Sequence, residues 1–489
     1  MALVWTYDTA AHLLLRAGFG HNGSFSKKNG DATQVRALAN LTPDKAVDRL
    51  LKIPLSKARG PTDDFLKLQR WWFDKMRTSK PLREKMVLFL HTHFATAKTK
   101  VDRPLYMAKQ NALFREFAIG DFRALVKRIN VDPAMLWWLD GQDNTAGAPN
   151  ENYARELMQL FTLGPEDFAG AHNYSQDDVT QVARILTGWY NVETKTDVVG
   201  QFDANRHDTG SPTAKTVFAR NLTPPQETPN QALSNFFTVT DQGALEHEFL
   251  VDKLFAHTDT ENRPTAARFI TRKLWKFFAY DPDVDDNGGA RADLPLIDDL
   301  ADTFVANNYS LAAVLKAMFL REEFYADATR TVKGPVEYVV GSLRMLKGKV
   351  SKTRKETLVG DSMPNMGQEI LDPPSVFSWR GNLSWITTQT LLTRYAFARD
   401  LAAGEKTTKF DLGFNVFTYF KPEPVDRQFI IDRLLHVLGP LTIDATSNAE
   451  LLAWLGTADP VDLSNDDFVT RRVRPLVNLI LSLPQYLVH

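Results

Sequence analysis

Cysteine is absent from this chain of 489 residues. Its absence excludes disulfides, thiolate nucleophiles, and zinc or iron–sulfur sites with cysteine ligands. A metal ion bound here needs imidazole and carboxylate ligands, a set that suits zinc, iron, manganese or copper. The compartment stays open, because periplasmic proteins also occur without cysteine.

Long apolar runs are absent as well. No stretch approaches the roughly 18 consecutive apolar residues that a membrane-spanning helix needs. Asp8, His12 and Arg16 interrupt the start of the chain, where a signal peptide would have a basic start and an apolar run. We expect no membrane span and, on this sequence, a cytoplasmic protein, or a periplasmic or exported one if a signal peptide was removed.

Neither sign of charge dominates. The chain has 58 Lys and Arg residues against 59 Asp and Glu residues, so no global field favours nucleic acid or an anionic membrane surface. We therefore expect no nucleic-acid partner. Hydrophobic residues make up 44% of the sequence and charged residues 24%, which is typical of a globular protein.

Several strong catalytic motifs are missing too. The sequence has no P-loop, no G-x-G-x-x-G, no G-x-S-x-G, no H-E-x-x-H and no EF-hand loop. These absences count against nucleotide-dependent enzymes and α/β-hydrolases.

What the sequence does contain is helical periodicity. Apolar residues recur every three to four positions in many segments, for example over 62–79. Strand signals are scarce, and the best are the short runs 215–218 and 416–419. We predict a mainly α, large multi-helix globular fold with long loops and little β-structure.

The domain organisation follows from a shift in composition. The stretch 201–242 is rich in Thr, Pro, Asn and Gln and has no clear period. We predict an N-terminal helical region at 1–200, a loop-rich connection at 201–242, and a C-terminal helical region at 243–489 that packs on the first as one unit. Another irregular stretch is predicted over 348–383.

Two histidines lie in an apolar helix predicted over 81–95. His91 and His93 are two residues apart, so their side chains point about 200° away from each other on an ideal helix. Both cannot bind one ion unless the helix ends or distorts there. Either histidine could be a metal ligand or general base. Alternatively, both are core histidines that hydrogen-bond to a carboxylate or carbonyl group.

The segment PNENYAREL at 149–157 is dense in polar residues. Asn150 is suited to cap a helix, Glu151 suits its positive end, and Glu151 and Arg155 are spaced to pair. A capped, solvated helix and a functional site both explain the pattern. As a site, the segment and its surroundings supply the catalytic candidates Asp140, Glu151, Arg155, Glu156 and His91, and the substrate-binding candidates Asn150, Asn152, Trp137 and Trp138.

Two loop segments add further candidates. His207 and Asp208 are adjacent, and such a pair can bind a metal or orient a base, although a turn-forming Asp is the commoner explanation. Trp379 and Trp385 could stack on a substrate ring or simply cap the core. The metal-ligand candidates are His91, His93, Glu156, His207 and Asp208.

Several blocks of this sequence resemble a known family. The most specific are AAHLLLRAGFG at 10–20, LREKMVLFLHTHFAT at 82–96 and NENYARELMQLFTLG at 150–164, and later ones include VKGPVEY at 332–338 and WITTQTLLTR at 385–394. Together they resemble the bacterial family catalogued as domain of unknown function 1800. The matches follow in order from about residue 10 to about residue 400.

The resemblance implies a bacterial, largely helical protein with no assigned activity. Members are often exported and often encoded beside a family that resembles sulfatases and phosphatases, so a sulfatase-like partner protein is one expectation. Two departures stand out. The family usually has Gly-Trp where this chain has Ser378-Trp379, and the usual signal peptide is missing here.

Two functions of different classes follow from these residues. The first is an enzyme with a His/Glu/Asn/Arg polar site, with or without a divalent metal ion as cofactor, which acts as a hydrolase or oxidoreductase on a small-molecule, carbohydrate or peptide ligand. The second is a non-catalytic protein that binds a polysaccharide or an assembly partner. We further hypothesise that His91 or His93 meets Glu156 and His207 in one pocket, because imidazoles in an apolar helix need polar partners.

Overall fold

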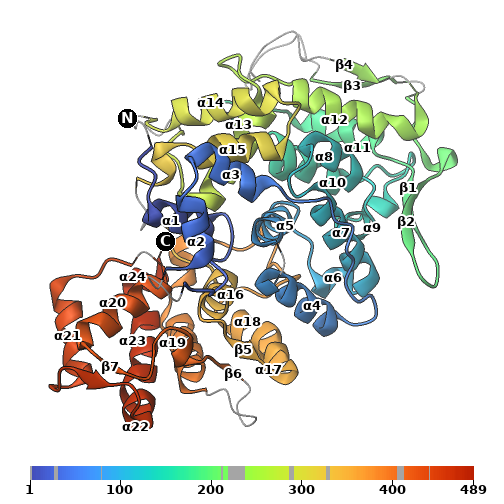
Figure 1. The fold of residues 1–489 in the computed structure, drawn as a ribbon. Helices are drawn as coiled ribbons and strands as arrows, with labels where there is room; N and C mark the ends of the chain where they lie inside the picture. Colours follow the sequence, from blue (N-terminus) through green and yellow to red (C-terminus); the bar gives the residue numbers. More distant parts are fainter. Residues whose placement is uncertain are drawn as a thin grey trace.

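The computed structural model confirms the mainly α-helical fold (Figure 1). It describes residues 3–26, 31–78, 80–210, 213–218, 237–239, 241–285, 291–326, 331–404, 412–439 and 441–488. Within these ranges, no helix is long and apolar enough to cross a membrane.

Helices follow one another along most of the chain. Those of the first part are α1 (Tyr7–Arg16), α2 (Thr33–Ala39), α3 (Pro43–Leu51), α4 (Phe65–Thr78), α5 (Pro81–His93), α6 (Lys98–Val101), α7 (Pro104–Phe117), α8 (Phe122–Ile129), α9 (Pro133–Trp138), α10 (Glu151–Glu156) and α11 (Gln176–Ile185). Those of the second part are α12 (Glu246–Ala256), α13 (Thr265–Phe278), α14 (Leu294–Ala306), α15 (Leu311–Phe319), α16 (Pro335–Met345), α17 (Lys352–Thr357), α18 (Met363–Asn365), α19 (Thr388–Ala403), α20 (Arg427–Val437), α21 (Ala445–Leu455), α22 (Asp466–Phe468), α23 (Arg474–Ser482) and α24 (Pro484–Leu487).

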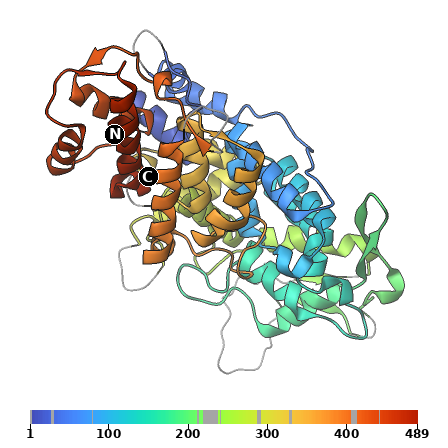
Figure 2. The same cartoon turned by 90° about the horizontal axis from the view of Figure 1, so that it is seen from below.

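Short 3-10 and π-helical turns and a little β-structure complete the fold. The turns that matter below are η2 (Leu157–Thr162), η7 (Asn382–Trp385) and η8 (Val416–Thr418). In the described part of the chain, strands form two-stranded antiparallel pairs: β1 (Trp189–Glu193) with β2 (Val198–Phe202), β3 (Lys215–Val217) with β4 (Phe237–Val239), β5 (Lys349–Val350) with β6 (Leu412–Gly413), and β7 (Pro424–Val425) with β8 (Val461–Asp462). Helices α19 to α24 gather at one end of the molecule and the β1–β2 hairpin lies at the other, as Figures 1 and 2 both show.

One hydrophobic core contains residues from all three predicted regions. Its buried side chains extend from Leu13 to Leu487 and include Val217 and Val239. Of the predicted connection at 201–242, residues 211–212, 219–236 and 240 lie outside the described residues.

Helix α5 lies in the middle of the molecule, seen nearly end-on in Figure 1. Pro81 lies in the first turn of α5. The backbone N–H groups of that turn have no partner within the helix, so proline, which lacks an N–H, loses no helical hydrogen bond there. The residues from Leu82 to His93 are buried, apart from Thr92. The helix packs against α4 and α7. A helix that is apolar on most sides is stable in such a position, because every face meets other apolar side chains.

Helix α10 begins as the sequence predicted and ends in an unexpected way. The Asn150 side chain caps it by accepting a hydrogen bond of 2.9 Å from the Asn152 backbone N–H. The helix then continues without a break into η2, a π-helical turn. The last carbonyl groups of a helix have no partner within it. In η2, those of Leu160 and Phe161 accept hydrogen bonds from side chains of other helices.

Of the two strands predicted from the sequence, one is confirmed and the other is wrong. The strand predicted over 215–218 is confirmed as β3. The strand predicted over 416–419 is wrong, because that segment forms the 3-10 turn η8. The Asn415 side chain accepts a hydrogen bond of 3.1 Å from the Phe417 N–H, and such local bonds compete with strand pairing. The stretch 348–383, predicted as irregular, contains α17 and α18.

Candidate functional site

A pocket of about 820 Å³ opens between α5, η2, α13 and the loop 376–385. A volume of this size suits a small molecule. The first turn of α16 also contributes to its lining, through Gly334 just before the helix and Glu337 within it.

The wall of the pocket is largely aromatic. Phe89 of α5 and Phe277 of α13 meet edge to face, with ring centroids 5.3 Å apart. Trp379 and Trp385, each only 8% exposed, form another part of the wall. Phe377 also lines the pocket but is 68% exposed, so the pocket opens to solvent at this loop. Such a wall can hold a flat ring and keep water away from it.

Lys273 of α13 brings an amine into this aromatic surrounding. Its Nζ donates a hydrogen bond of 2.8 Å to the Leu160 carbonyl of η2 and lies 4.8 Å from the centre of the Phe269 ring. Within the described part of the chain, it has no other hydrogen-bond or ion-pair partner. Burial and, to a smaller extent, the nearby charge of Lys276 together lower its pKa to about 7.

His93 of α5 lines the same pocket. Its Nε2 lies 3.1 Å from the Phe161 carbonyl of η2, which can only accept a hydrogen bond, so Nε2 carries the proton. The other ring nitrogen, Nδ1, is then a hydrogen-bond acceptor. It is buried and has no partner among the described residues. Burial is the main reason that the pKa of His93 lies well below its usual range, and the charge of Lys273 is the second. The ring is therefore neutral.

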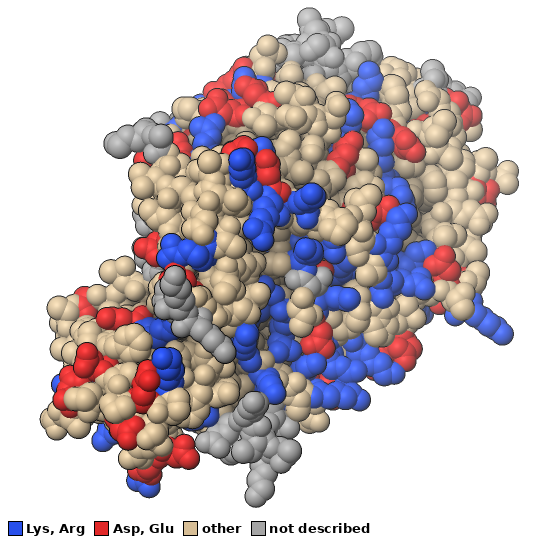
Figure 3. Space-filling view, viewed as in Figure 1, with Lys and Arg blue, Asp and Glu red and all other residues tan. Residues whose placement is uncertain are grey.

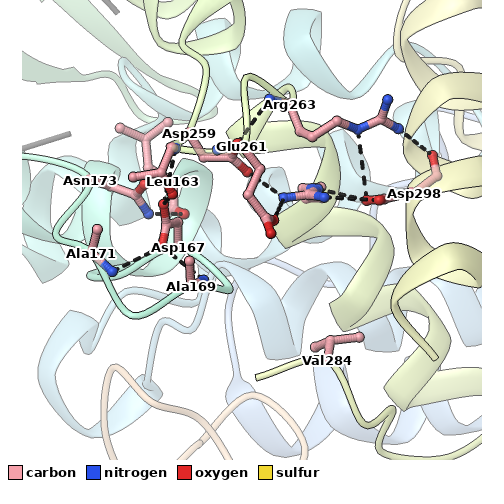
Figure 4. A network of polar contacts seen from close by, with 12 residues as sticks. Leu163, Asp167, Ala169, Ala171, Asn173, Asp259, Glu261, Arg263, Val284 and Asp298 are labelled. Carbon is pink, nitrogen blue, oxygen red and sulfur yellow. Dashed lines mark hydrogen bonds and ion pairs between the residues drawn. The ribbon is translucent and has the colours of Figure 1, made fainter. Parts of the chain in front are cut away.

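The other basic residues of α13 all have carboxylate partners. Arg268 lies 2.7 Å from Asp259 and 2.6 Å from both Glu261 and Asp298. Figure 4 shows these carboxylates in the network around it. Arg272 pairs with Asp285 at 2.5 Å. Lys276 pairs with Asp281, also at 2.5 Å.

A smaller hollow of about 300 Å³ lies beside this network and shares Pro165 and Phe269 with the aromatic pocket. Because its charged groups are matched to one another, its geometry is that of a structural ion-pair network. Hydrogen bonds from Arg291, followed by those from Arg268, lower the pKa of Glu261 to about 2 against the opposing effect of burial.

Glu337 brings a carboxylate to the lining of the aromatic pocket, and two buried lysines, Lys85 and Lys333, interact with it. Burial alone would raise the pKa of Glu337, but the Lys85 ammonium that pairs with it lowers the pKa below its usual value. Lys333 is 4% exposed and donates a hydrogen bond of 2.6 Å to the Tyr486 carbonyl. Burial lowers its pKa to about 7. Of these three lysines, Lys273 lines the aromatic pocket, and Lys85 and Lys333 do not.

Three of the residues selected from the sequence line this pocket: His93, Trp379 and Trp385. His91 does not line it, but its ring centroid lies 5.7 Å from that of Trp379. The two histidines point in different directions, as helical spacing predicts, and burial lowers the pKa of His91 to about 3.

The polar residues of 149–157 form a separate network. Glu151 lies 3.3 Å from Arg155 and accepts a hydrogen bond of 2.7 Å from Gln176, so it ties α10 to α11. Asn152 donates to the Leu139 carbonyl at 3.4 Å. Glu156 is half-buried, burial raises its pKa, and its Oε2 has no hydrogen-bond partner in the described residues.

The neighbouring candidates join a surface cluster around Lys100. Its Nζ lies 2.9 Å from Asp140 and 5.7 Å from the Trp138 ring, and its carbonyl accepts a hydrogen bond of 3.2 Å from Trp137. The lining of the aromatic pocket includes none of Asp140, Asn150, Glu151, Asn152, Arg155, Glu156, Trp137 or Trp138. Their catalytic and binding roles stay predictions.

His207 belongs to a third polar group. One ligand atom each from His207, Asp241 and Glu246 lies within 4.8 Å of the other two, so this triad could hold a metal ion. His207 Nδ1 lies 2.9 Å from the Thr187 carbonyl, which can only accept a hydrogen bond, so Nδ1 carries the proton and Nε2, 3.2 Å from Glu246, keeps its lone pair. A backbone carbonyl orients many metal-binding histidines in this way.

A buried lysine, however, lies inside this triad. Lys215 of β3 is fully buried, and its Nζ lies 2.5 Å from Glu246 and 3.3 Å from His207 Nε2. The ammonium group thus supplies the positive charge that a metal ion would bring. Asp208, the other predicted ligand, pairs with Arg184 at 2.7 Å instead.

These contacts place the selected residues in separate surroundings. His93 meets η2 through the carbonyl of Phe161 and not through the carboxylate of Glu156. In the described part of the chain, no hydrogen bond or ion pair joins any two of His91, His93, Glu156 and His207. The single pocket hypothesised for them therefore has no direct contact to support it.

Surface charge is unevenly spread. Figure 3 shows Lys and Arg side chains gathered over the middle of one face, around α4, with Asp and Glu between them. Some are paired, such as Lys67 with Asp63 at 2.6 Å and Arg77 with Asp74 at 3.3 Å. The expectation that nucleic acid is not a partner stays a prediction.

Sequence reasoning missed Lys273, although a signal was present. Phe269, Lys273 and Phe277 are spaced four residues apart, so they share one face of α13. On an amphipathic helix, a face with two phenylalanines is expected to be apolar, so a lysine between them is unusual. Its significance depends on α5 and η2, which pack nearby from distant parts of the chain.

Comparison with known proteins identifies the family. The sequence model for the family described as "Protein of unknown function (DUF1800)" matches residues 12–488. This chain is a DUF1800 protein. No curated protein and no solved structure gives a match. The membership confirms the resemblance noted in the sequence.

The pocket lies wholly within the matched region of the DUF1800 chain. Four of the sequence blocks that carry the resemblance, at 82–96, 150–164, 332–338 and 385–394, each contribute residues to its lining. Segments far apart in the DUF1800 sequence thus meet at this one place.

Proposed function

We propose that the DUF1800 chain binds a small acidic ligand with a flat ring in the aromatic pocket, and that Lys273 is the partner of the acidic group. One observation carries this proposal: a lysine amine lines an aromatic pocket and forms no ion pair with a carboxylate among the described residues. The candidate classes are acidic sugars and aromatic acids.

Electrostatics favours an anion here. An ammonium group buried without a counter-charge costs free energy, and a carboxylate or sulfate on the ligand would supply that charge. Because the aromatic wall excludes water, an ion pair inside the pocket is screened less than one on the surface.

Shape favours a ring. Phe89, Phe277, Trp379 and Trp385 offer apolar faces and edges on several sides. Aromatic side chains prefer stacked or edge-to-face contacts with ring centroids about 4.5–7 Å apart. A ligand with a single ring and one acidic group fits a pocket of about 820 Å³ with room to spare.

Two matched fluorescent probes test this proposal. 1-Anilinonaphthalene-8-sulfonate has an acidic group, and N-phenyl-1-naphthylamine has the same rings without it. We expect Lys273→Gln to raise the Kd of the sulfonate about tenfold, a loss of about 1.4 kcal/mol, and to leave the Kd of the neutral probe unchanged. Lys52→Gln, at an exposed lysine, should alter neither Kd.

An equal Kd for the sulfonate in wild type and Lys273→Gln would contradict the assigned role of Lys273. Equal loss of both probes would mean that the substitution collapses the pocket. Lys273→Arg, which keeps the positive charge, should then restore sulfonate binding if charge is what matters.

A second candidate function rests on the triad of His207, Asp241 and Glu246. Its three ligand atoms are close enough for a divalent cation, but the ion would have to displace Lys215. None of the three residues lines the aromatic pocket. Such an ion would therefore stabilise the structure around β3 and α12 and would not act on a ligand in the pocket.

Competition between lysine and metal can be measured directly. We expect wild type purified without chelator to carry no stoichiometric zinc, iron, manganese or copper. We expect Lys215→Met to gain thermal stability on addition of zinc or manganese, because the triad loses its internal cation. Stoichiometric metal in wild type would contradict this view of Lys215.

A further inference from the structure

We infer that the Lys273 amine forms an imine with the ketone of a 2-oxo acid bound in the aromatic pocket. The inference rests on the proposed function, because it uses the same pocket and the same acidic ligand class. It adds a covalent step, and it makes the chain an enzyme or a covalent carbonyl binder.

The surroundings of Lys273 favour a neutral, nucleophilic amine. Only an unprotonated amine attacks a carbonyl group. The other basic residues of α13 are held as cations by carboxylates, whereas Lys273 has a backbone carbonyl and a phenylalanine ring beside it. Its pKa of about 7 leaves much of the amine unprotonated at neutral pH.

The contact with η2 also fixes the direction of the amine. One N–H donates to the Leu160 carbonyl at 2.8 Å, which restrains the end of a side chain that is otherwise flexible. The nitrogen lone pair then points away from that hydrogen bond. The π-helical turn is the reason that this carbonyl is free to accept.

His93 gives the pocket a neutral hydrogen-bond acceptor. Its ring has an unprotonated Nδ1 that is buried and lacks a hydrogen-bond partner in the residues described. It lines the pocket, and the charge of Lys273 acts on it. Because its pKa is held well below the usual range, His93 stays neutral, and the protons of imine formation pass to and from water at the open side of the pocket, where Phe377 is exposed.

The reaction balances without an external oxidant or reductant. The Lys273 nitrogen attacks the ketone carbon, the C=O electron pair moves to oxygen, and the nitrogen loses a proton to water that enters from the open side of the pocket. The oxygen of the resulting carbinolamine is protonated, the C–O bond breaks, and water leaves as the C=N bond forms. Overall, amine, ketone and one proton give a protonated imine and water, and hydrolysis reverses the reaction.

The ligand carboxylate keeps its role in this scheme. In a 2-oxo acid the carboxylate is bonded to the ketone carbon, so it stays next to the nitrogen after the imine forms. The protonated imine is a cation, and it replaces the lysine ammonium as the partner of that carboxylate. The covalent step thus stabilises the same ion pair on which binding depends.

Phenylpyruvate and 3-phenyllactate form a matched pair of probes. Both have a ring and a carboxylate, but only phenylpyruvate has a ketone. We expect phenylpyruvate with sodium cyanoborohydride at neutral pH to give one rapid covalent adduct, located at Lys273 by peptide mass spectrometry. Labelling of Lys273 should be at least about tenfold faster than that of exposed Lys52 in the same sample, because an ordinary lysine amine is almost fully protonated at this pH.

Variants separate the covalent step from binding. Lys273→Arg should abolish the rapid adduct, and Lys276→Arg on the same helix should retain it. 3-Phenyllactate should give no adduct but should slow labelling by competition. If 3-phenyllactate displaces the anilinonaphthalene sulfonate from wild type while Lys273 is labelled no faster than Lys52, the imine is ruled out and the binding proposal stands. If 3-phenyllactate also fails to displace the sulfonate, both proposals fail.

Discussion

At the scale of single residues, Lys273 is an amine in a place that disfavours its charge. Protein cores contain lysines that are paired, and Lys85 with Glu337 is one such case here. Lys273 has a carbonyl partner and an aromatic wall instead. Residues that lower the stability of the folded protein are expected at functional sites, where they are kept for their role in function.

The pH dependence of stability should reveal this cost. The folded pKa of Lys273 is about 7, below its ordinary value of 10.5. Between these values the unfolded chain holds a proton that the folded chain lacks, so wild type gains stability as pH rises through this window. Below about pH 7 both states hold the proton, and the full cost of burying the charge is present.

We therefore expect Lys273→Met to be more stable than wild type at about pH 6, by up to a few kcal/mol. The lost hydrogen bond to Leu160 costs only about 1 kcal/mol, so the removal of the buried charge dominates. The advantage should shrink toward about pH 10. Urea unfolding at several pH values measures it, with Lys67→Met as the control, since Lys67 is exposed and paired with Asp63. A variant less stable than wild type at every pH would contradict this account.

At the scale of elements, two irregular segments build the pocket. The π-helical turn η2 presents the carbonyls of Leu160 and Phe161, and these hold Lys273 and His93. The loop 376–385 supplies Trp379 and Trp385, which form a small apolar cluster with Val332, separate from the main core. Regular helices supply the framework, and the residues that distinguish the pocket are held where helical geometry ends or changes.

Ser378 marks strain in that loop. Its φ of 62° lies in the left-handed region that favours glycine, and its Oγ is buried with no hydrogen-bond partner among the described residues. We expect Ser378→Gly to stabilise the protein by roughly 1 kcal/mol, because it relieves both the backbone strain and the unpaired hydroxyl.

Ser375 provides a matched control in the same loop. Its φ is not in the left-handed region, and its Oγ accepts a hydrogen bond of 3.2 Å from the Phe377 N–H. Ser375→Gly should therefore lower the melting temperature, while Ser378→Gly raises it. If both substitutions lower the melting temperature equally, the loop does not carry the strain assigned to Ser378.

At the scale of the whole molecule, the sequence reveals local structure but not the contacts between segments far apart in the chain. The sequence predicted α5 and α10, and the cap at Asn150, because these depend on neighbours within a few residues. It also predicted that His91 and His93 point apart. It could not show that η2 meets α13 more than a hundred positions later in the chain, and so the role of Lys273 stayed hidden.

The candidate site illustrates the same limit. Trp379, Trp385 and His93 were selected for their residue types and do line the pocket. The dense polar segment at 149–157 drew attention for its composition, but its side chains form contacts around the start of α10, and the pocket is lined instead by Gln159 and Leu160 of η2. Composition located the helix correctly, whereas packing decided which of its groups face a ligand.

A crystal structure with a brominated naphthalene sulfonate tests the central claim most directly, because the anomalous signal of bromine locates the ligand without bias. The account predicts one fully occupied site in the aromatic pocket, with a sulfonate oxygen within hydrogen-bond distance, about 2.7–3.2 Å, of Lys273 Nζ and the rings against Phe277 and Trp379. A sulfonate bound elsewhere, or an empty pocket at saturating concentration, would contradict it.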